Sequence, residues 1–219
     1  MTDQHQPSHE SFMRDVATHE MTVFRDDGLY RHIRFRRPNT MCMHFDLITY
    51  PRYLCYSGDM GTYVFSRLED MFEFFRTDRD INPGYWAEKL QAVDNHGHGK
   101  GSATEFDKIR FERVVKEYLV SWMREGGLNR ADRRALREAV QDEVLIHSDD
   151  GEHEALSAAY SFNFNTHDHR HFDFNDIWEH RLDRYTHYFI WCCRALKWGI
   201  AKYDAAKEQA ASSEEAFHG

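Results

Sequence analysis

The sequence lacks any long apolar run. A membrane-spanning helix needs about 20 mainly apolar residues, but the most apolar stretch, residues 188–201, carries Arg194 and Lys197. Residues 1–10 are polar and mixed in charge, without the basic start and apolar centre of a secretory signal. We therefore expect no membrane association and a cytoplasmic location.

Cysteines and catalytic motifs are also scarce. The 219 residues include four cysteines, at positions 42, 55, 192 and 193, in neither CxxC spacing nor a disulfide-dense pattern. We expect reduced thiols, the last two inert on a buried helix. Residues 97–102, with the sequence GHGKGS, fail as a phosphate-binding loop because Gly101 separates Lys100 from Ser102 and helical sequence precedes them.

The composition is that of a folded chain with an aromatic-rich core. Hydrophobic residues make up 41% and aromatic residues 15% of the sequence, and the length favours a single domain of residues 1–219. The formal charge of -9 disfavours general nucleic-acid affinity unless basic groups gather on one face. We expect flexible tails at 1–10 and 205–219 and mobile loops at 94–103 and 147–171.

The first third of the chain has the pattern of a β-meander. Val, Ile, Tyr, Phe and Thr are frequent between positions 21 and 65, and turn signals such as Asp27-Gly28 and Ser57-Gly58 interrupt them. This pattern predicts four to five antiparallel strands, near residues 21–26, 29–36, 43–49, 53–57 and 61–65, because the connections are too short for parallel crossovers.

Helical periodicity dominates the rest of the sequence. Capping patterns predict helices that begin near Ser66, Pro83 and Thr104, and another helix spans about 130–146. The helix at Pro83 should run through Leu90 and Val93, and the helix at Thr104 should run through Tyr118 and Trp122, with Trp122 at a core position. The longest helix should begin at Asp176, with apolar residues on several faces, so its middle should lie in the core. The predicted fold class is α+β, with an N-terminal antiparallel meander packed with several helices and a central long C-terminal helix.

A histidine-rich tract offers candidate metal ligands. In an extended strand, His167, His169 and His171 would share one face, an arrangement that suits Zn²⁺ or Ni²⁺. A solvated polar loop is the alternative, because neither HExxH nor paired CxxC spacing accompanies the tract. We expect no dedicated cofactor, only adventitious zinc or nickel.

Two basic clusters are candidate binding surfaces. Arg31, Arg34 and Arg36 belong to one predicted strand, where alternation places Arg34 and Arg36 opposite Ile33 and Phe35. The second cluster lies on the helix at about 130–146 and contains Arg133, Arg134 and Arg137. Either cluster could bind phosphate or an acidic partner, but basic residues also pair with neighbouring acids or face water.

Several longer segments together resemble a known family. They are residues 45–51, 53–63, 68–76, 81–89, 172–179 and 184–196. The sequence resembles an uncharacterised protein family encoded by tailed phages and prophages of enterobacteria and their relatives, over most of residues 12–204. The resemblance implies a protein made in an infected or lysogenic bacterial cell, as an accessory factor rather than a shell component. It implies no catalytic residues, and the histidines at 167–171 are not part of its pattern.

Three functional hypotheses follow, in order of preference. The first is a non-enzymatic accessory protein that binds and modulates a host or phage protein, for example by inhibiting host defence. The second is a metal-dependent enzyme that uses the histidine tract. The third is a nucleic-acid-binding protein that uses the two basic clusters, which would show strongly salt-dependent binding.

Overall fold

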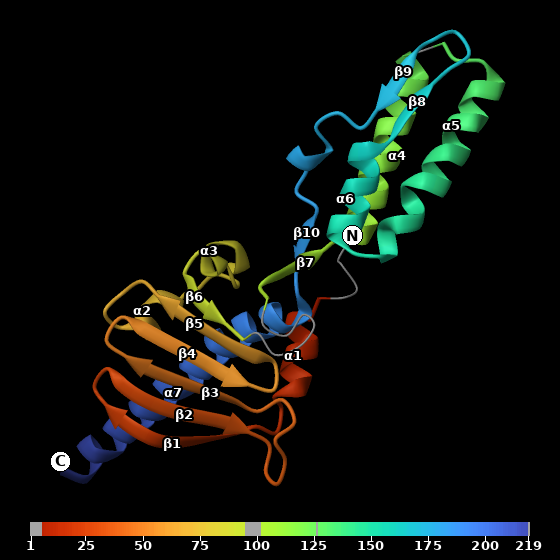
Figure 1. Ribbon diagram of the computed structural model, residues 1–219. Coiled ribbons are helices and arrows are strands. Elements are labelled where there is room, and N and C mark those ends of the chain that lie inside the picture. Colours follow the sequence, from red (N-terminus) through yellow and green to blue (C-terminus); the bar gives the residue numbers. More distant parts are fainter. Residues whose placement is uncertain (1–5, 95–101, 126, 219) are drawn as a thin grey trace. The chain divides into compact units, whose positions relative to one another are not determined.

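The structure is a computed structural model that describes residues 6–94, 102–125 and 127–218. The first part of the chain forms an antiparallel sheet whose six strands follow chain order (Figure 1). The strands are β1 (Glu20–Asp27), β2 (Tyr30–Arg36), β3 (Phe45–Tyr50), β4 (Tyr53–Gly58), β5 (Gly61–Ser66) and β6 (Leu90–Val93). The tight turn after β1 uses Gly28 at φ 59°, a left-handed conformation that costs glycine little. The predicted α+β fold is confirmed.

The sixth strand corrects one prediction. The sequence predicted that the helix beginning at Pro83 would continue through Leu90 and Val93, but α3 (Pro83–Ala87) ends earlier. The following residues instead pair with β5, with Val93 opposite Tyr63. Pairing satisfies backbone groups that β5 would otherwise leave open at the sheet edge, so tertiary context overrides the local helical pattern.

Two other helices begin later than the sequence predicted. Asp70, rather than Ser66, caps α2 (Met71–Phe75), because its side chain accepts a hydrogen bond of 2.9 Å from the backbone N–H of Phe72. The long helix α7 (His187–His218) begins eleven positions after Asp176, where Thr186 Oγ1 accepts from the N–H of Phe189 at 3.1 Å. A 3₁₀ turn, η2 (Ile177–Glu179), and a strand, β10 (Asp183–Tyr185), precede it.

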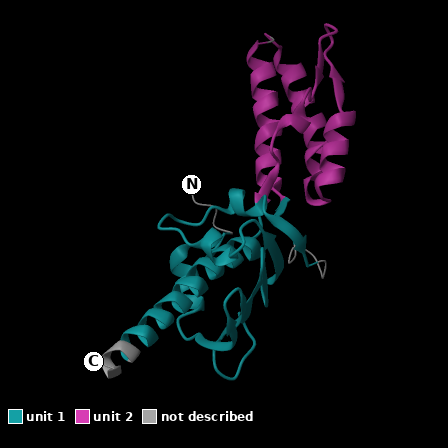
Figure 2. Ribbon diagram, turned by 90° about the vertical axis from the view of Figure 1, so that its left-hand side faces the viewer, with its two compact units in different colours: residues 1–105, 185–219 teal, residues 106–184 magenta. Residues whose placement is uncertain are grey.

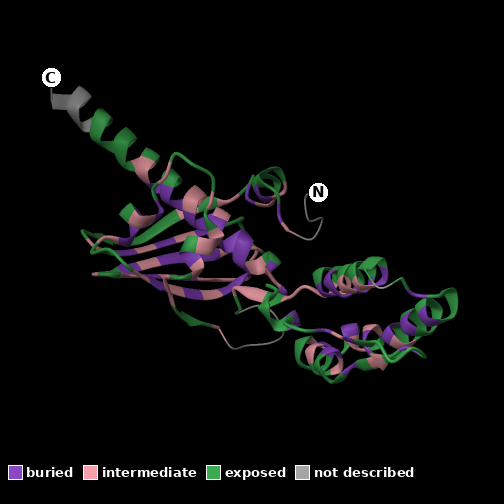
Figure 3. Cartoon of the chain, turned by 90° about the horizontal axis from the view of Figure 1, so that it is seen from above, coloured by how far each residue is buried: buried purple, intermediate pink, exposed green. Residues whose placement is uncertain are grey.

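The middle of α7 lies in the core, as predicted (Figure 3). Trp191 is fully buried, with its ring centroid 5.1 Å from that of Phe12 in α1 (His9–Asp15) and 5.7 Å from that of Phe45. Gly199 permits close approach of helix and sheet, because a Cβ atom there would lie 3.1 Å from side-chain atoms of Phe35 and Leu47. The helix therefore covers one face of the sheet at short range.

The chain groups into two compact units, whereas length had favoured one domain (Figure 2). Unit 1 comprises residues 1–105 and 185–219, and unit 2 comprises residues 106–184. Each has its own hydrophobic core. The core of unit 2 is built mainly from α4 (Lys108–Glu125), α5 (Arg130–Glu143) and α6 (Glu152–Ser161). Its fully buried members include Phe111, Val115, Leu136, Val140 and Ala155.

The prediction of a mobile loop at 147–171 is wrong, because this segment has regular secondary structure. This segment contains the end of a 3₁₀ helix, η1 (Leu145–Asp149), all of α6 and the strand β8 (Asn163–Asn165), which pairs with β9 (His171–Asp173). Helix α6 buries the small side chains of Ala155 and Ala159, so its core-facing side carries no strong hydrophobic pattern. Similarly, Thr104 lies in β7 (Thr104–Phe106), which pairs with β10, and α4 begins only at Lys108.

The other expected flexible segments fall only partly within the described residues. Residues 1–5 and 95–101, which belong to the predicted N-terminal tail and the predicted loop at 94–103, lie outside them. The predicted C-terminal tail at 205–219 is helical as far as His218. Of the helices that the described residues form, none combines the length and apolar character that crossing a membrane requires.

Candidate functional site

The first arginine of the basic strand is held inside unit 1. Arg31 is 9% exposed and forms a bidentate pair with Asp70, with nitrogen–oxygen distances of 2.9 and 2.8 Å. Its guanidinium carbon also lies 4.6 Å from the centroid of the Phe72 ring. Because its charge is already paired and stacked, Arg31 joins β2 to the start of α2 rather than offering a binding group.

Arg34 is also engaged, whereas Arg36 is exposed. Arg34 donates to both carboxylate oxygens of Asp46, at 2.7 and 2.8 Å, and His32 Nε2 lies 2.8 Å from the same carboxylate. Burial disfavours the charged form of Asp46, but the hydrogen bonds from Arg34 and His32 outweigh it and lower the carboxyl pKa below its ordinary value. Of the three predicted arginines, only Arg36 remains an exposed group without a carboxylate partner.

The second basic cluster lies on the exposed side of α5. Arg133, Arg134 and Arg137 are all exposed. Arg134 pairs with Glu138 at 2.7 Å, and Arg133 donates a weak bond of 3.4 Å to the carbonyl of Met123. This is the arrangement expected of a solvated helix face with local ion pairs, although it leaves cationic groups at the surface.

The three candidate metal-binding histidines do not converge. His167 and His169 lie in the turn between β8 and β9, where His169 has φ 63°, so they do not alternate along a strand. His171, in β9, lies with Nδ1 3.2 Å from Asn165 Oδ1 and Nε2 3.2 Å from Asp173 Oδ2. The turn therefore separates the imidazoles that an extended strand would have aligned.

His167 meets carboxylates instead of the other histidines. Its Nδ1 lies 2.6 Å from Asp132 Oδ2, and ligand-type atoms of His167, Asp132 and Asp168 all lie within 4.8 Å of one another. Asp168 also pairs with Arg170 at 3.1 Å. A metal would have to break the His167–Asp132 hydrogen bond and bind next to the Arg170 cation. The His167–Asp132 contact links the β8–β9 turn to the first helical turn of α5.

A pocket of about 490 Å³ lies between α4 and the segment that runs from β9 past η2. We call it the α4 pocket. Its lining residues are Glu117, Tyr118, Ser121, Trp122, Glu125, His171, Phe172, Asp173, Asn175 and His180. None of the lining residues that the structure describes is Lys or Arg, so the pocket combines aromatic rings with carboxylates and imidazoles.

Hydrogen bonds and ring contacts hold the walls of the α4 pocket together. Tyr118 Oη donates to the backbone carbonyl of Asn175 at 2.7 Å and lies 3.3 Å from His180 Nε2. The Trp122 and Phe172 ring centroids are 5.2 Å apart. Burial, and then the carboxylates of Asp176 and Glu179, raise the pKa of Tyr118 above its ordinary value.

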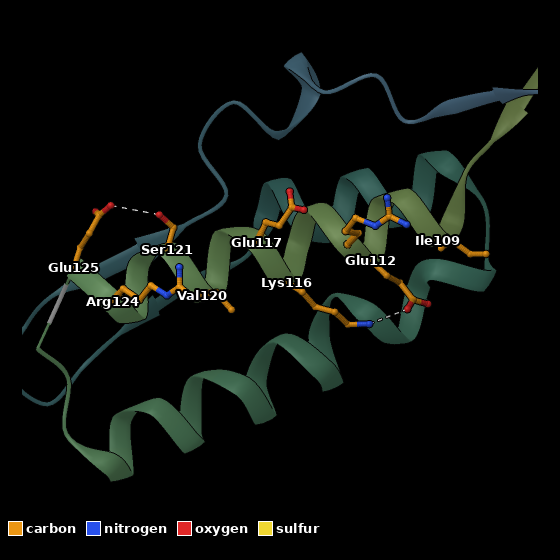
Figure 4. A pocket seen from close by; sticks show the side chains of 9 residues that line it. Ile109, Glu112, Lys116, Glu117, Val120, Ser121, Arg124 and Glu125 are labelled. Atoms are coloured by element: carbon orange, nitrogen blue, oxygen red, sulfur yellow. Dashed lines mark hydrogen bonds and ion pairs between the residues drawn. The ribbon is translucent and has the colours of Figure 1, made fainter. Parts of the chain in front are cut away.

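A shallow groove of about 770 Å³ runs along the outer face of α4 (Figure 4). We call it the α4 groove. Its lining residues are Ile109, Glu112, Arg113, Lys116, Glu117, Val120, Ser121, Arg124 and Glu125. Ile109 and Val120 are 56% and 43% exposed, and the Lys116–Glu112 pair of 3.1 Å lies between them along the helix. Glu117, Ser121 and Glu125 also line the α4 pocket, so the two surfaces are continuous.

Sequence reasoning missed this part of unit 2. The sequence placed Trp122 in the core and Tyr118 on the same helix; both pack against the core of unit 2, but they are only half-buried and also line the α4 pocket. A signal was present, since Glu117, Ser121 and Glu125 are spaced four residues apart and form a polar stripe beside the two rings. The residues contributed by β9 and by the positions on either side of η2 could not be anticipated, because their segment was expected to be a loop or a continuous helix.

The cysteines provide no reactive thiol in the core. Cys192 and Cys193 are fully buried, and burial raises the pKa of both thiols well above the ordinary value. Burial also raises the pKa of Cys55, whereas Cys42 is exposed.

Comparisons with models of protein families, with curated proteins and with solved structures found no match to this chain.

Proposed function

We propose that this chain is a phage- or prophage-encoded accessory protein that binds and modulates a host or phage protein in the bacterial cytoplasm. The resemblance of the sequence to a phage family over most of residues 12–204 supports this setting. The α4 groove supplies the proposed contact surface, and the exposure of Ile109 and Val120 between charged neighbours is the observation that carries the proposal.

The groove exposes apolar side chains among charged ones. Non-obligate interfaces combine apolar centres with a polar, solvent-accessible rim. Here Val120 lies between charged groups on the same helix, including Glu117 and Arg124 (Figure 4). With about 1.5 Å of rise per residue, the stretch from Ile109 to Glu125 offers a strip about 24 Å long, enough for a helix or an extended segment of a partner.

Other exposed groups of unit 2 are of the types that anchor interfaces. Trp178 and Tyr160 are 56% and 74% exposed, and their ring centroids lie 6.0 Å apart. Tryptophan and tyrosine are enriched among residues that dominate binding energy. We expect the partner surface to include at least one of these groups besides the groove.

The proposal is tested by purifying the full chain with an affinity tag from infected host cells. We expect one identified protein in fixed stoichiometry with wild type, and its loss with Val120→Asp, which introduces a charge into the groove. Ala135→Asp is the matched control, because Ala135 is exposed on α5. The recovered protein must then bind the purified chain directly. Recovery of nucleic acid in place of protein, or equal recovery with both variants, would contradict the proposal.

A further inference from the structure

The α4 pocket combines the two features that recognise an organic cation. Tyr118 and Trp122 are half-buried, so each ring keeps surface toward the pocket, and Phe172 closes the wall behind Trp122. An aromatic face attracts a cation through its quadrupole, and tryptophan does so best. The rings therefore provide a surface against which a flat cationic group can stack.

The charged side chains that line the pocket are carboxylates, beside the two imidazoles of His171 and His180. Glu117, Glu125 and Asp173 line the pocket. The carboxylates of Asp176 and Glu179 lie near enough to Tyr118 to contribute to the rise in its pKa. Glu125 accepts only a weak hydrogen bond of 3.3 Å from Ser121, and Asp173 lies 3.2 Å from His171. Among the described residues, Glu117 takes part in no hydrogen bond or ion pair. A ligand cation would thus meet the carboxylate of Glu117, which no other described residue pairs with.

We propose that the α4 pocket binds an arginine side chain of the protein partner. A guanidinium group is planar, stacks on aromatic rings and donates hydrogen bonds to carboxylates through a rigid fork. The ammonium group of lysine is compact and more strongly hydrated, so it uses flat aromatic walls less well. This inference rests on the proposed function, since the arginine belongs to the partner that docks along the adjoining α4 groove.

The volume is sufficient for this occupant. Ligand pockets of about 300–1,000 Å³ accommodate drug-sized molecules, and the α4 pocket, at about 490 Å³, falls within that range. An arginine side chain with part of its backbone would occupy the space and leave room for water bridging to Glu125 or Asp173. A neutral sugar or nucleoside would also fit in size, but it would leave the carboxylate charge of Glu117 unpaired.

The test is an NMR titration of the full-length chain with a blocked Gly-Arg-Gly peptide. The signal followed is the indole N–H of Trp122, assigned by comparison with Trp122→Phe. The peptides Gly-Lys-Gly and Gly-Gln-Gly serve as ligand controls. Glu117→Gln removes one pocket charge, and Asp142→Asn removes one exposed charge on α5, outside the pocket.

We expect saturable shifts with the arginine peptide, weaker binding by the lysine peptide and none by the glutamine peptide. Glu117→Gln should weaken arginine binding by about fivefold, the size expected for one exposed charge pair with aromatic support, and Asp142→Asn should leave it unchanged. Equal weakening by both variants, or equal binding of the three peptides, would overturn the assignment. If the chain captures its partner protein but does not bind the arginine peptide, this inference alone is refuted. If it binds the arginine peptide but captures no protein from infected cells, the proposed function is refuted.

Discussion

Replacement of Trp191 by Ala tests whether α7 is the centre of unit 1. The side chain is fully buried, in edge-on contact with Phe12 and Phe45. Truncation of a core tryptophan costs about 3–5 kcal/mol. The indole N–H also donates to Asp15 at 3.0 Å, but that half-buried carboxylate can recover water, so its loss adds at most about 1 kcal/mol. We expect a destabilisation of about 4 kcal/mol.

The assay is urea unfolding followed by circular dichroism. With a denaturant slope of about 2 kcal/mol per molar urea, the midpoint for unit 1 should fall by about 2 M. Trp178→Ala is the matched control, because that side chain is 56% exposed and its removal should change stability by less than about 0.5 kcal/mol. A midpoint for Trp191→Ala within about 0.3 M of wild type would refute the placement of α7 in the core.

Three further predictions concern the sheet and the histidine turn. Gly58→Ala should destabilise unit 1 by about 1–3 kcal/mol, because the new Cβ would lie 2.2 Å from the carbonyl oxygen of His44; an unchanged thermal midpoint would count against this register. Asp46→Asn should lower the free energy of unfolding at neutral pH. The difference in free energy of unfolding between this variant and wild type should shrink as the pH falls below about 4, because a carboxyl whose folded pKa is depressed contributes stability above its unfolded pKa and loses it on protonation. A constant difference from pH 7 to pH 2 in urea titrations would contradict the role of the Arg34 pair. Elemental analysis of untagged protein should find far less than one zinc or nickel ion per chain, because the turn offers ligands without a rigid supporting shell. A dedicated metal site would instead be shown by nearly one metal ion per chain that resists mild chelation and is lost in His167→Ala.

The sheet could be predicted because its signals are local. Alternation along β2 puts Ile33 and Phe35 on the buried face, and Asp27-Gly28 marks the turn before it. β6 could not be predicted, because its pairing with β5 depends on an open edge elsewhere in the fold. Likewise α6 is stabilised through the small residues Ala155 and Ala159, whose burial depends on neighbouring helices rather than on a strong pattern of their own.

Local sequence patterns indicate less of the candidate site than of the sheet. Both clusters of arginines were visible, but the carboxylates that neutralise Arg31 and Arg34 come from positions 70 and 46, and no local pattern indicates such pairing. The histidines were visible too, yet His169 has a left-handed backbone conformation in the turn, and His167 contacts Asp132 rather than the other histidines. The α4 pocket unites residues from α4 and from 171–180, so only the folded chain brings its lining together.

Site-specific photocrosslinking from α4 tests the central claim most directly. A benzoylphenylalanine at position 120, in the α4 groove, would report the protein that touches this surface in infected cells, and the same group at position 135 on α5 would report incidental neighbours. We predict one discrete crosslinked protein from position 120 and none from position 135. Crosslinks of equal pattern and yield from both positions, or none from either while the chain is folded and expressed, would contradict a partner-binding role for α4.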